Sequence, residues 1–233
     1  MMIDPAVFPI AARWPAADPS VIQLYSYPTP NGVKVSIALE EMGLPYEAHL
    51  VTLKDADVKS DAFTSLNPNG KIPAIIDPNG PDGPLGLFES GAILIYLAEK
   101  SGKLIGGTAS DKARIIQWVM FQMGGVGPMF GQLGYFHKFA GKDIDDLRPR
   151  QRYIDEAKRL LGVVDRALDG QDWIAGDFSV ADIALAPWLN ALDFYGAKEV
   201  TGYNDLKNVP GYVTRFYDRP AVQKGKTIPD PKG

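Results

Sequence analysis

The sequence of 233 residues predicts an α/β amino-terminal domain followed by an all-α domain. Three observations carry this prediction. Strand-like and helical segments alternate up to about residue 100, the composition then shifts to Gly, Ser, Thr and Lys, and from about residue 111 apolar residues recur with the helical period of 3.6. The predicted divisions are an arm over residues 1–20, an α/β domain over 21–100, a linker over 101–110, an all-α domain over 111–220 and a tail over 221–233.

The composition excludes several classes of function. Hydrophobic residues make up 45% of the chain, which is ample for a buried core, and the formal net charge of -4 provides no basic surface for nucleic acid. No apolar run is long enough to span a bilayer, and residues 1–19 lack the basic start and continuous apolar core of a signal peptide. We therefore expect a cytoplasmic protein that binds neither nucleic acid nor a membrane, with loose ends at both termini.

The chain contains no cysteine. Disulfides, thiolate metal sites and a catalytic protein thiol are therefore excluded, so any sulfur chemistry must use the sulfur of a ligand. The only two histidines, His49 and His137, are too widely separated in the sequence to indicate a metal site, and no metal is expected.

The α/β domain begins with a strand and a helix. Residues 21–26 are β-rich, and the turn that follows contains Thr29, a suitable N-cap, and Pro30, which suits the first helical position. Apolar residues then repeat on one helical face up to residue 42, and Gly43 provides the stop. The prediction is a helix that begins at residue 30.

The remaining elements of this domain complete a recognisable order. Residues 44–53 are extended, residues 61–66 form a short helix or turn, and residues 72–76 and 85–88 form a hairpin around a Pro- and Gly-rich turn. Another helix opens at residue 90. The β-α-β-α-β-β-α order is the thioredoxin arrangement, in which a right-handed crossover joins a parallel pair of strands.

Two features around the hairpin form a candidate ligand site. An Ile72–Pro73 bond at a sheet edge can be cis and leaves the backbone N–H and C=O of Ile72 available to an extended peptide. The helix that opens at Ser90 presents unpaired N–H groups and a positive dipole end, which attract a carboxylate. A small peptide with a terminal carboxylate fits both features. The alternative is that Ser90 only caps the helix and that Glu89 is a charge beside its dipole.

The second domain has helical spacing throughout. Its first helix contains three glycines and a proline over residues 124–128, which predict a break or kink. A second helix follows over residues 154–168. Ser179 and Asp182 form a capping-box pattern, to which we assign a structural role and no part in the site.

The order Lys-Ile-Pro, hairpin, Glu-Ser and helix resembles the glutathione-binding half of the glutathione transferases, whose amino-terminal domain is thioredoxin-like. This resemblance implies that Ile72, which precedes a cis Pro73, pairs with the cysteinyl backbone of glutathione. It implies that Glu89 and Ser90 hold the γ-glutamyl end and that Lys71 reaches a glutathione carboxylate. By residue type alone, Lys71 would be a solvated surface charge.

The string Thr29-Pro30-Asn31-Gly32 resembles the bacterial nu class of glutathione transferases, which includes disulfide-bond reductases, and more distantly the fungal nitrogen-regulator proteins. Further nu-like segments extend the resemblance over about residues 21–220. They are residues 67–73, Gln117-Trp118-x-Met120, residues 124–129 and Arg152-Tyr153.

The chemistry explains why Thr29 and Asn31 are expected to be catalytic. A thiol with a pKa of about 8.5 is mostly protonated at neutral pH, so a hydroxyl donor, an amide donor and a helix N-terminus that favour the thiolate raise the concentration of the nucleophile. Without the resemblance, Thr29 would be an ordinary N-cap and Asn31 an ordinary turn residue.

The same resemblance extends the binding site into the second domain. It implies that Arg152 contacts a second glutathione and that Gln122 also binds glutathione, whereas Arg152 alone could pair with Asp155 or Glu156 and Gln122 could hydrogen-bond within the core. One position departs from the pattern, because Val58 stands where the nu class carries a Gln and the fungal relatives a His.

The implied function is glutathione-dependent thiol transfer. A glutathione thiolate attacks a glutathionyl sulfur, which covers reduction of disulfides and cleavage of thioethers beside an aryl ketone. Two glutathiones then bind per subunit, with a small disulfide or aromatic thioether as the other substrate. The alternatives are conjugation of glutathione to an electrophile and a non-catalytic glutathione-binding regulator. The family also implies a homodimer, to which apolar residues over 88–96 would contribute.

Overall fold

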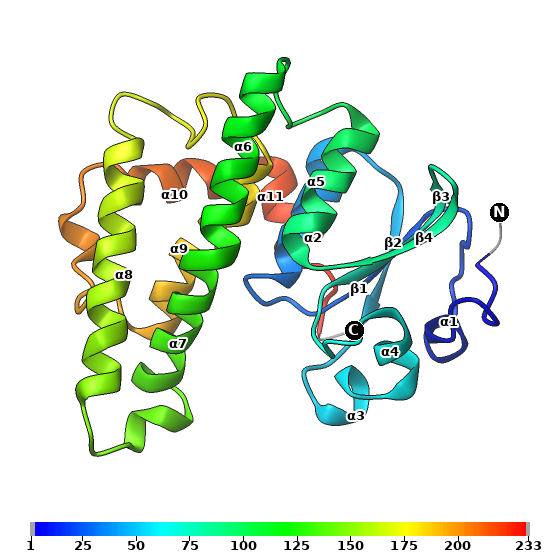
Figure 1. Cartoon of the computed structure of the whole chain (residues 1–233), viewed down its shortest axis with the longest axis horizontal. Coiled ribbons are helices and arrows are strands. Elements are labelled where there is room, and N and C mark those ends of the chain that lie inside the picture. Colours follow the sequence, from blue (N-terminus) through cyan, green and yellow to red (C-terminus); the bar gives the residue numbers. More distant parts are fainter. Residues whose placement is uncertain (1–2, 232–233) are drawn as a thin grey trace. The chain divides into compact units, whose positions relative to one another are not determined.

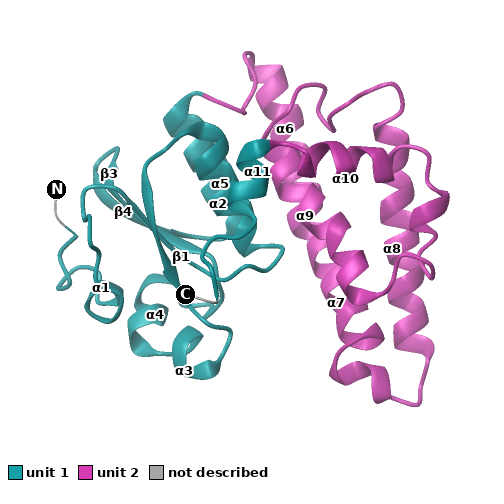
Figure 2. Ribbon diagram, turned by 180° about the vertical axis from the view of Figure 1, so that it is seen from behind, with its two compact units in different colours: residues 1–102, 220–233 teal, residues 103–219 magenta. Residues whose placement is uncertain are grey.

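The computed structural model describes residues 3–231 and divides them into two compact units. Unit 1 contains residues 3–102 together with 220–231, and unit 2 contains residues 103–219 (Figure 2). All four strands belong to unit 1, and the regular elements described in unit 2 are helical (Figure 1). The predicted α/β and all-α division is therefore confirmed.

Unit 1 is built on a four-stranded sheet with the order β2-β1-β3-β4. Strand β1 (Ile22–Ser26) pairs in parallel with β2 (Tyr46–Leu50) and antiparallel with β3 (Ala74–Gly80), which pairs antiparallel with β4 (Gly83–Phe88). The connection from β1 to β2 is the helix α2 (Gly32–Met42). The predicted strand order along the chain is confirmed. The expected position of Pro73 at a sheet edge is wrong, because β3 is an interior strand.

The two faces of the sheet are covered by different helices. Tyr25 and Ala74 point to one face, where they share a buried cluster with Phe63 of α4 (Asp61–Leu66) and Ile10 of α1 (Ile10–Arg13). The short helix α3 (Asp55–Val58) precedes α4. Because successive side chains of a strand alternate, the buried Leu24 points to the other face, against which α2 and α5 (Ser90–Ser101) pack side by side (Figure 1).

Helix α2 begins two residues later than predicted. The expectation was that Pro30 takes the first helical position, whereas the helix starts at Gly32, with Asn31 at the N-cap. Thr29 nevertheless satisfies the first N–H groups of the helix, because its side chain accepts from the Gly32 N–H and its carbonyl accepts from the Val33 N–H. The predicted stop is confirmed, since Gly43 takes the left-handed conformation with φ of 69°.

The two ends of the chain are more ordered than expected. The arm over residues 1–20 was predicted to be loose, yet Ile10 is fully buried and Phe8 and Trp14 pack on the cluster around Phe63. The tail over residues 221–233 was predicted to be loose from residue 224, yet α11 (Pro220–Gly225) packs against α2. The prediction is wrong for the arm where it packs, and for the tail it is wrong at residues 224 and 225. Residues 1–2 and 232–233 lie outside the described part of the chain.

The contact between α11 and α2 depends on a glycine. The Ser36 hydroxyl donates to the Gly225 carbonyl at 2.7 Å, and a Cβ atom added at Gly225 would lie 2.6 Å from the Cα atom of Ile37. Only a residue without a side chain permits this approach. The polar composition of the tail conceals the buried Val222 beside this glycine.

Unit 2 is a helical bundle around α9. Nearly every residue in the first three turns of α9 is buried, as expected of a helix surrounded by others. The helices and helical turns are α6 (Ala109–Phe121), the π-helical turn Gln122–Val126, α7 (Gly127–His137), the 3₁₀ turn Ala140–Asp143, α8 (Arg148–Ala167), α9 (Val180–Tyr195), the 3₁₀ turn Tyr203–Asp205 and α10 (Val209–Tyr217). None of the helices described between residues 3 and 231 combines the length and apolarity needed to cross a bilayer.

The glycine-rich stretch, for which a break or kink was predicted, forms a π-helical turn without interrupting the helix. Helices α6 and α7 continue through Gln122–Val126 as one ribbon (Figure 1). Pro128 has no N–H, and in a regular α-helix its ring would clash with the carbonyl group of Gly124. The wider π turn avoids this clash while the chain stays helical.

The predicted capping box in unit 2 is confirmed. Ser179 caps α9, and the Asp182 carboxylate accepts hydrogen bonds from the Ser179 N–H, the Ile174 N–H at 2.9 Å and the Tyr212 hydroxyl at 3.0 Å. Burial raises the pKa of Asp182 to about 6, against these hydrogen bonds, which lower it. Asp182 therefore joins α9, α10 and the preceding loop.

Candidate active site

The register of the sheet brings the candidate residues of unit 1 to one end of it. Tyr25 of β1 pairs with Ala74 of β3, which pairs with Phe88 of β4. The turn after β1, the residues before β3 and the residues after β4 therefore leave the sheet at the same end. These three segments contain Thr29 and Asn31, then Lys71, Ile72 and Pro73, then Glu89 and Ser90.

The turn between β1 and α2 presents the Thr29 hydroxyl in a defined orientation. The Gly32 N–H donates to Thr29 Oγ1 at 3.2 Å, and the Val33 N–H donates to the Thr29 carbonyl at 3.0 Å. Because the hydroxyl oxygen accepts from the backbone, its own proton can be donated to a ligand. Gly32 is required by close packing, since a Cβ atom there would lie 1.8 Å from the Tyr27 carbonyl oxygen.

Lys34 links Asn31 to Ser90. Its Nζ atom donates to Asn31 Oδ1 at 2.9 Å and to Ser90 Oγ at 3.3 Å, and its side chain is fully buried. Burial disfavours the ammonium and lowers the pKa of Lys34 to about 7, whereas the charge of Glu89 acts in the opposite direction. Two residues that the sequence singled out separately are thus joined by a third.

Sequence reasoning missed Lys34. A lysine is by default a surface residue, and nothing else about its type marks it. A signal was nevertheless available, because Lys34 interrupts an apolar run between Val33 and Val35 and stands three residues after Asn31, one helical turn away.

The turn before β3 is organised by a second residue that sequence reasoning passed over. The buried Asn67 side chain accepts the Asn69 N–H at 2.9 Å and donates to the Lys71 carbonyl, and the Gly70 N–H donates to the Asn67 carbonyl at 2.9 Å. This turn leaves the Lys71 side chain exposed.

The residues that follow leave a stretch of backbone open to a partner. The Ile72–Pro73 peptide is cis, as the sequence indicated. Ile72 lies two residues before Ala74, where β3 begins, and within residues 3–231 neither its N–H nor its carbonyl forms a backbone hydrogen bond. The Ile72 side chain is buried in the cluster around Phe63, which fixes the position of this open backbone.

The start of α5 has an unusual backbone. Glu89 occupies the N-cap with φ of 70°, a conformation that a residue other than glycine rarely adopts and that costs about 1–3 kcal/mol. The Glu89 side chain is exposed and makes no capping bond, and Ser90 is the first helical residue and is buried. The alternative in which Ser90 serves only as the N-cap is therefore wrong.

Val58 does not replace the polar contact that related sequences make at its position. It is buried in the cluster around Phe63, with its carbonyl against Gly70, while its neighbour Lys59 is exposed and pairs with Asp55 at 2.8 Å. At this position the chain contributes packing beneath the Asn67 turn.

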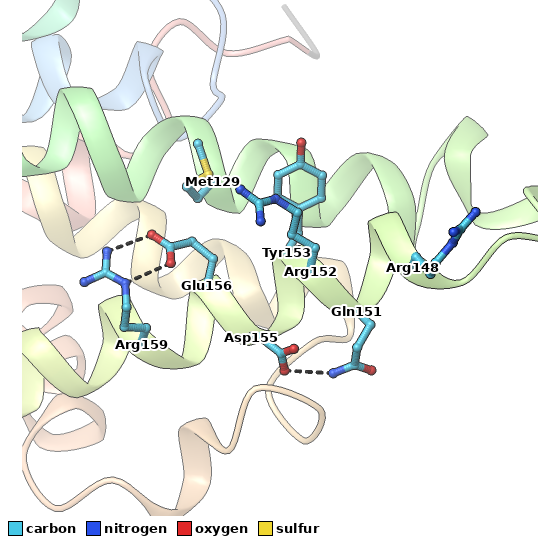
Figure 3. Close-up of a pocket in the computed structure, with 8 residues that line it drawn as sticks. All are labelled: Met129, Arg148, Gln151, Arg152, Tyr153, Asp155, Glu156 and Arg159. Carbon is cyan, nitrogen blue, oxygen red and sulfur yellow. Dashed lines mark hydrogen bonds and ion pairs between the residues drawn. The ribbon is translucent and has the colours of Figure 1, made fainter.

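The two candidate residues of unit 2 lie on different helical segments. Gln122 begins the π turn and is buried, and its amide lies 2.6 Å from where a Cβ atom at Gly127 would be. Arg152 on α8 lines an open groove of about 880 Å³ (Figure 3). The lining residues are Met129, Arg148, Gln151, Arg152, Tyr153, Asp155, Glu156 and Arg159.

The groove pairs its carboxylates with residues other than Arg152. Glu156 forms an ion pair with Arg159 at 2.7 Å, which lowers the pKa of Glu156, and Asp155 accepts from Gln151 at 2.8 Å (Figure 3). No ion pair joins Arg152 to a carboxylate within residues 3–231. Arg152 therefore forms no direct ion pair with Asp155 or Glu156 in this part of the chain, while its charge still contributes to the lowered pKa of Glu156.

No site in the described part of the chain has the composition of a metal centre, since His, Asp and Glu side chains nowhere gather in threes between residues 3 and 231.

The fold and this site define a thioredoxin-like domain with an open peptide-pairing backbone, joined in the chain to a helical domain. The sequence matches the family descriptions "Glutathione S-transferase, N-terminal domain" over residues 29–100 and "Glutathione S-transferase, C-terminal domain" over residues 130–219. The chain belongs to the glutathione S-transferase family, as the motif around Ile72 and Ser90 predicted.

Individual relatives add detail. The disulfide-bond oxidoreductase YfcG of Escherichia coli is 43% identical over 174 residues, which cover 73% of this chain and 80% of YfcG. A glutathione transferase of Burkholderia graminis was solved with two glutathione molecules bound per subunit. It is 60% identical to this chain, with a TM-score of 0.96, and the match covers 99% of this chain and 98% of the transferase. A glutathione transferase of Pseudomonas putida was solved with one glutathione disulfide bound per subunit. It is 55% identical to this chain, with a TM-score of 0.95, and the match covers 97% of this chain and 100% of the transferase.

Proposed function

We propose that this protein is a glutathione-dependent disulfide reductase of the nu class. The observation that carries the proposal is the open Ile72 backbone at the same end of the sheet as the donors of Thr29 and Asn31 and the start of α5. The disulfide-bond oxidoreductase YfcG, 43% identical, supports the assignment of the reaction.

Glutathione fits unit 1 as an extended peptide. Its cysteinyl backbone pairs with the N–H and C=O of Ile72 beside the cis Pro73, and its γ-glutamyl end meets Ser90 and Glu89 at the start of α5. Lys71, exposed on the turn before β3, reaches the other carboxylate. In this pose the sulfur lies near the start of α2.

The residues at the start of α2 then generate the nucleophile. The Thr29 hydroxyl, the Asn31 amide and the N-terminal end of α2 donate to the sulfur and favour the thiolate. The thiolate attacks one sulfur of the substrate disulfide, a new S–S bond forms, the old S–S bond breaks, and the departing thiolate takes up a proton. A second glutathione repeats the exchange, so one disulfide becomes two thiols while two glutathiones become one glutathione disulfide.

The second glutathione is assigned to unit 2. Arg152 has a fixed positive charge and lines a groove whose carboxylates have other partners, which suits a glutathione carboxylate. Gln122 is the other proposed contact. The Burkholderia graminis transferase with two glutathiones per subunit supports this stoichiometry.

The same attack explains a second substrate class. When the glutathionyl sulfur is bonded to carbon beside an aryl ketone, the thiolate forms glutathione disulfide, the C–S bond breaks, and the carbon takes up a proton with the electron pair delocalised into the ketone. Thioether cleavage therefore uses the same residues with a different leaving group. Conjugation to an electrophile needs only the first glutathione, and a non-catalytic regulator needs no turnover.

We assign the enzyme to the cytoplasm, where glutathione is kept mostly reduced, and expect a homodimer. Phe88 and the exposed edge of α5 are the proposed contribution of unit 1 to its interface, although Ile93 and Leu94 of the same stretch are buried within the unit. Sedimentation at micromolar concentration tests the dimer, because a species near the 25.4 kDa of one chain would contradict it.

Activity measurements distinguish these functions. Purified protein is assayed with hydroxyethyl disulfide, with a glutathionyl aryl-ketone thioether and with a chlorodinitrobenzene electrophile. Disulfide turnover that exceeds conjugation is the expected result. Conjugation without disulfide turnover would favour the one-glutathione transferase, and binding without any turnover would favour the regulator.

A further inference from the structure

Lys34 is a lysine with no exposed surface, and its side chain contacts Asn31 and Ser90 at the candidate active site. It lies on the first turn of α2, and its Nζ atom is 2.9 Å from Asn31 Oδ1 and 3.3 Å from Ser90 Oγ. A lysine in the interior of a helical face is costly to bury, and an apolar residue would pack there as well. Its presence therefore requires an explanation beyond packing.

The chemistry of an ammonium group determines how its partners are oriented. When Lys34 is protonated, its ammonium donates three hydrogen bonds and accepts none, so the Asn31 atom that faces it is the amide oxygen, which lies 2.9 Å from Nζ. The Asn31 NH₂ group, which can only donate, then points away from Lys34. By the same argument Ser90 accepts from Lys34 through its oxygen, and its hydroxyl proton is directed to another acceptor.

We propose that Lys34 is a positioning residue that turns the donor groups of Asn31 and Ser90 toward an anionic ligand. The inference rests on the proposed function, because it takes the ligand to be glutathione, with its thiolate at Asn31 and its γ-glutamyl carboxylate at Ser90. The side chain of Lys34 thereby orients both the residue at the thiolate, Asn31, and the residue at the γ-glutamyl carboxylate, Ser90.

The charges around Lys34 are consistent with this role. Glu89, at the start of α5, acts on Lys34 electrostatically, and on α11 Lys224 pairs with Glu40 on the last turn of α2 at 2.9 Å. A bound thiolate or carboxylate adds negative charge near the ammonium. Ligand binding and protonation of Lys34 therefore favour each other.

The test is a double-mutant cycle in the full-length protein with Lys34→Met, Asn31→Ala and the combined variant. Met has nearly the length of Lys without its donors, and it suits a buried site. Three quantities are measured: the Kd for S-methylglutathione, which binds the first site without a thiol that can ionise, the kcat/KM for hydroxyethyl disulfide, and the pKa of the bound glutathione thiol from its ultraviolet absorbance.

We expect Lys34→Met to lower kcat/KM by about 10- to 100-fold and to raise the pKa of the bound thiol, while the Kd for S-methylglutathione weakens only a few-fold. Because Lys34 acts through Asn31, adding Lys34→Met to Asn31→Ala should reduce turnover by less than about threefold more. Lys59→Met is the control, since Lys59 is exposed and pairs with Asp55, and it should leave all three quantities unchanged.

Two outcomes would overturn the positioning role, provided that the variants still bind S-methylglutathione. One is that the losses of turnover from the two single substitutions multiply in the double mutant, and the other is that Lys34→Met keeps wild-type turnover. Failure of the wild-type protein to bind S-methylglutathione would instead remove the proposed function, and this inference with it. If Lys34→Met does not fold, Asn31→Asp decides, because it keeps an oxygen for Lys34 but offers no amide donor. Wild-type turnover in Asn31→Asp would contradict the proposal.

Discussion

Tyr25 of β1 lies opposite Ala74 of β3 in antiparallel register. Ala74 in turn lies opposite Phe88 of β4. The segment after β1, the segment before β3 and the segment after β4 therefore leave the sheet at the same end, within about one residue of this row of paired residues. A slip of one residue in either pairing would turn the side chains of that strand to the opposite face and separate these segments. The site therefore depends on the buried apolar pairing that fixes this register.

Asn31→Ala is expected to lower kcat for disulfide reduction by about 10- to 1000-fold while glutathione still binds. The reason is that the substitution removes one hydrogen bond to the glutathione thiolate. Steady-state kinetics and calorimetry on the same preparation measure the two effects. Asn204→Ala, an exposed asparagine of unit 2, is the matched control. Unchanged disulfide turnover in Asn31→Ala would show that the amide does not act on the sulfur.

Arg152→Ala is expected to abolish or weaken binding of the second glutathione and to leave the first intact. The reason is that a glutathione carboxylate would lose its only assigned arginine in the groove on α8. Calorimetric stoichiometry is the measurement, with a fall from about two to one glutathione per chain. Arg166→Ala, on the same helix but outside the groove, should retain both. A single glutathione in the wild-type protein would contradict the assignment.

Gly32→Ala is expected to distort the turn that holds Thr29, because the added Cβ atom would lie 1.8 Å from the Tyr27 carbonyl oxygen. Since backbone must move to relieve this contact, we expect a loss of stability of about 1–3 kcal/mol and a loss of disulfide turnover. Thermal unfolding and kinetics measure both. Gly107→Ala has no atom within 4 Å of its new Cβ and should behave as wild type.

The pH dependence of stability should reveal Lys34. Burial lowers the pKa of this lysine from 10.5 to about 7, so between these two values the folded state binds fewer protons than the unfolded state. The contribution of Lys34 to the free energy of unfolding therefore rises with pH above about 7 and is constant below it. Relative to Lys34→Met, wild type should gain up to about 1.4 kcal/mol per pH unit above pH 7 in urea denaturation. A difference between the two proteins that stays constant above pH 7 would contradict this.

Asp182→Ala should destabilise the protein by about 2–4 kcal/mol, because it removes the cap of α9 and leaves the buried N–H of Ile174 and the hydroxyl of Tyr212 without their acceptor. Urea denaturation measures the loss. Asp193→Ala at the far end of the same helix, where the side chain is exposed, should change stability by less than about 0.5 kcal/mol. Equal effects of the two substitutions would contradict the structural role of Asp182.

The sequence predicts what depends on short-range pattern. The hairpin, the stop of α2 at Gly43 and the cap at Ser179 each follow from residues within a few positions, and the structure confirms them. The hairpin turn itself is tighter than its Pro- and Gly-rich sequence indicates, because β3 continues to Gly80 and only residues 81 and 82 connect the strands.

What the sequence could not predict depends on contacts between distant segments. Ile10 is buried only because the arm lies against α4, and an arm that contains four prolines gives no local sign of this. The same is true of Lys34, because its proposed role depends on its contact with Ser90, which is 56 positions away in the sequence. The roles of Thr29, Asn31 and Arg152 come from resemblance to related sequences and stay predictions.

The docking of α11 on α2 determines the order in which the chain can complete its folding during synthesis. Residues 103–219 form unit 2 and leave the ribosome before residues 220–225, which close the α2 face of unit 1. Unit 2 can therefore finish folding while the earlier-synthesised unit 1 still exposes the Ile37 face of α2. The first domain to emerge is the last to be completed, and the open face of α2 is the surface that a nascent-chain chaperone would protect.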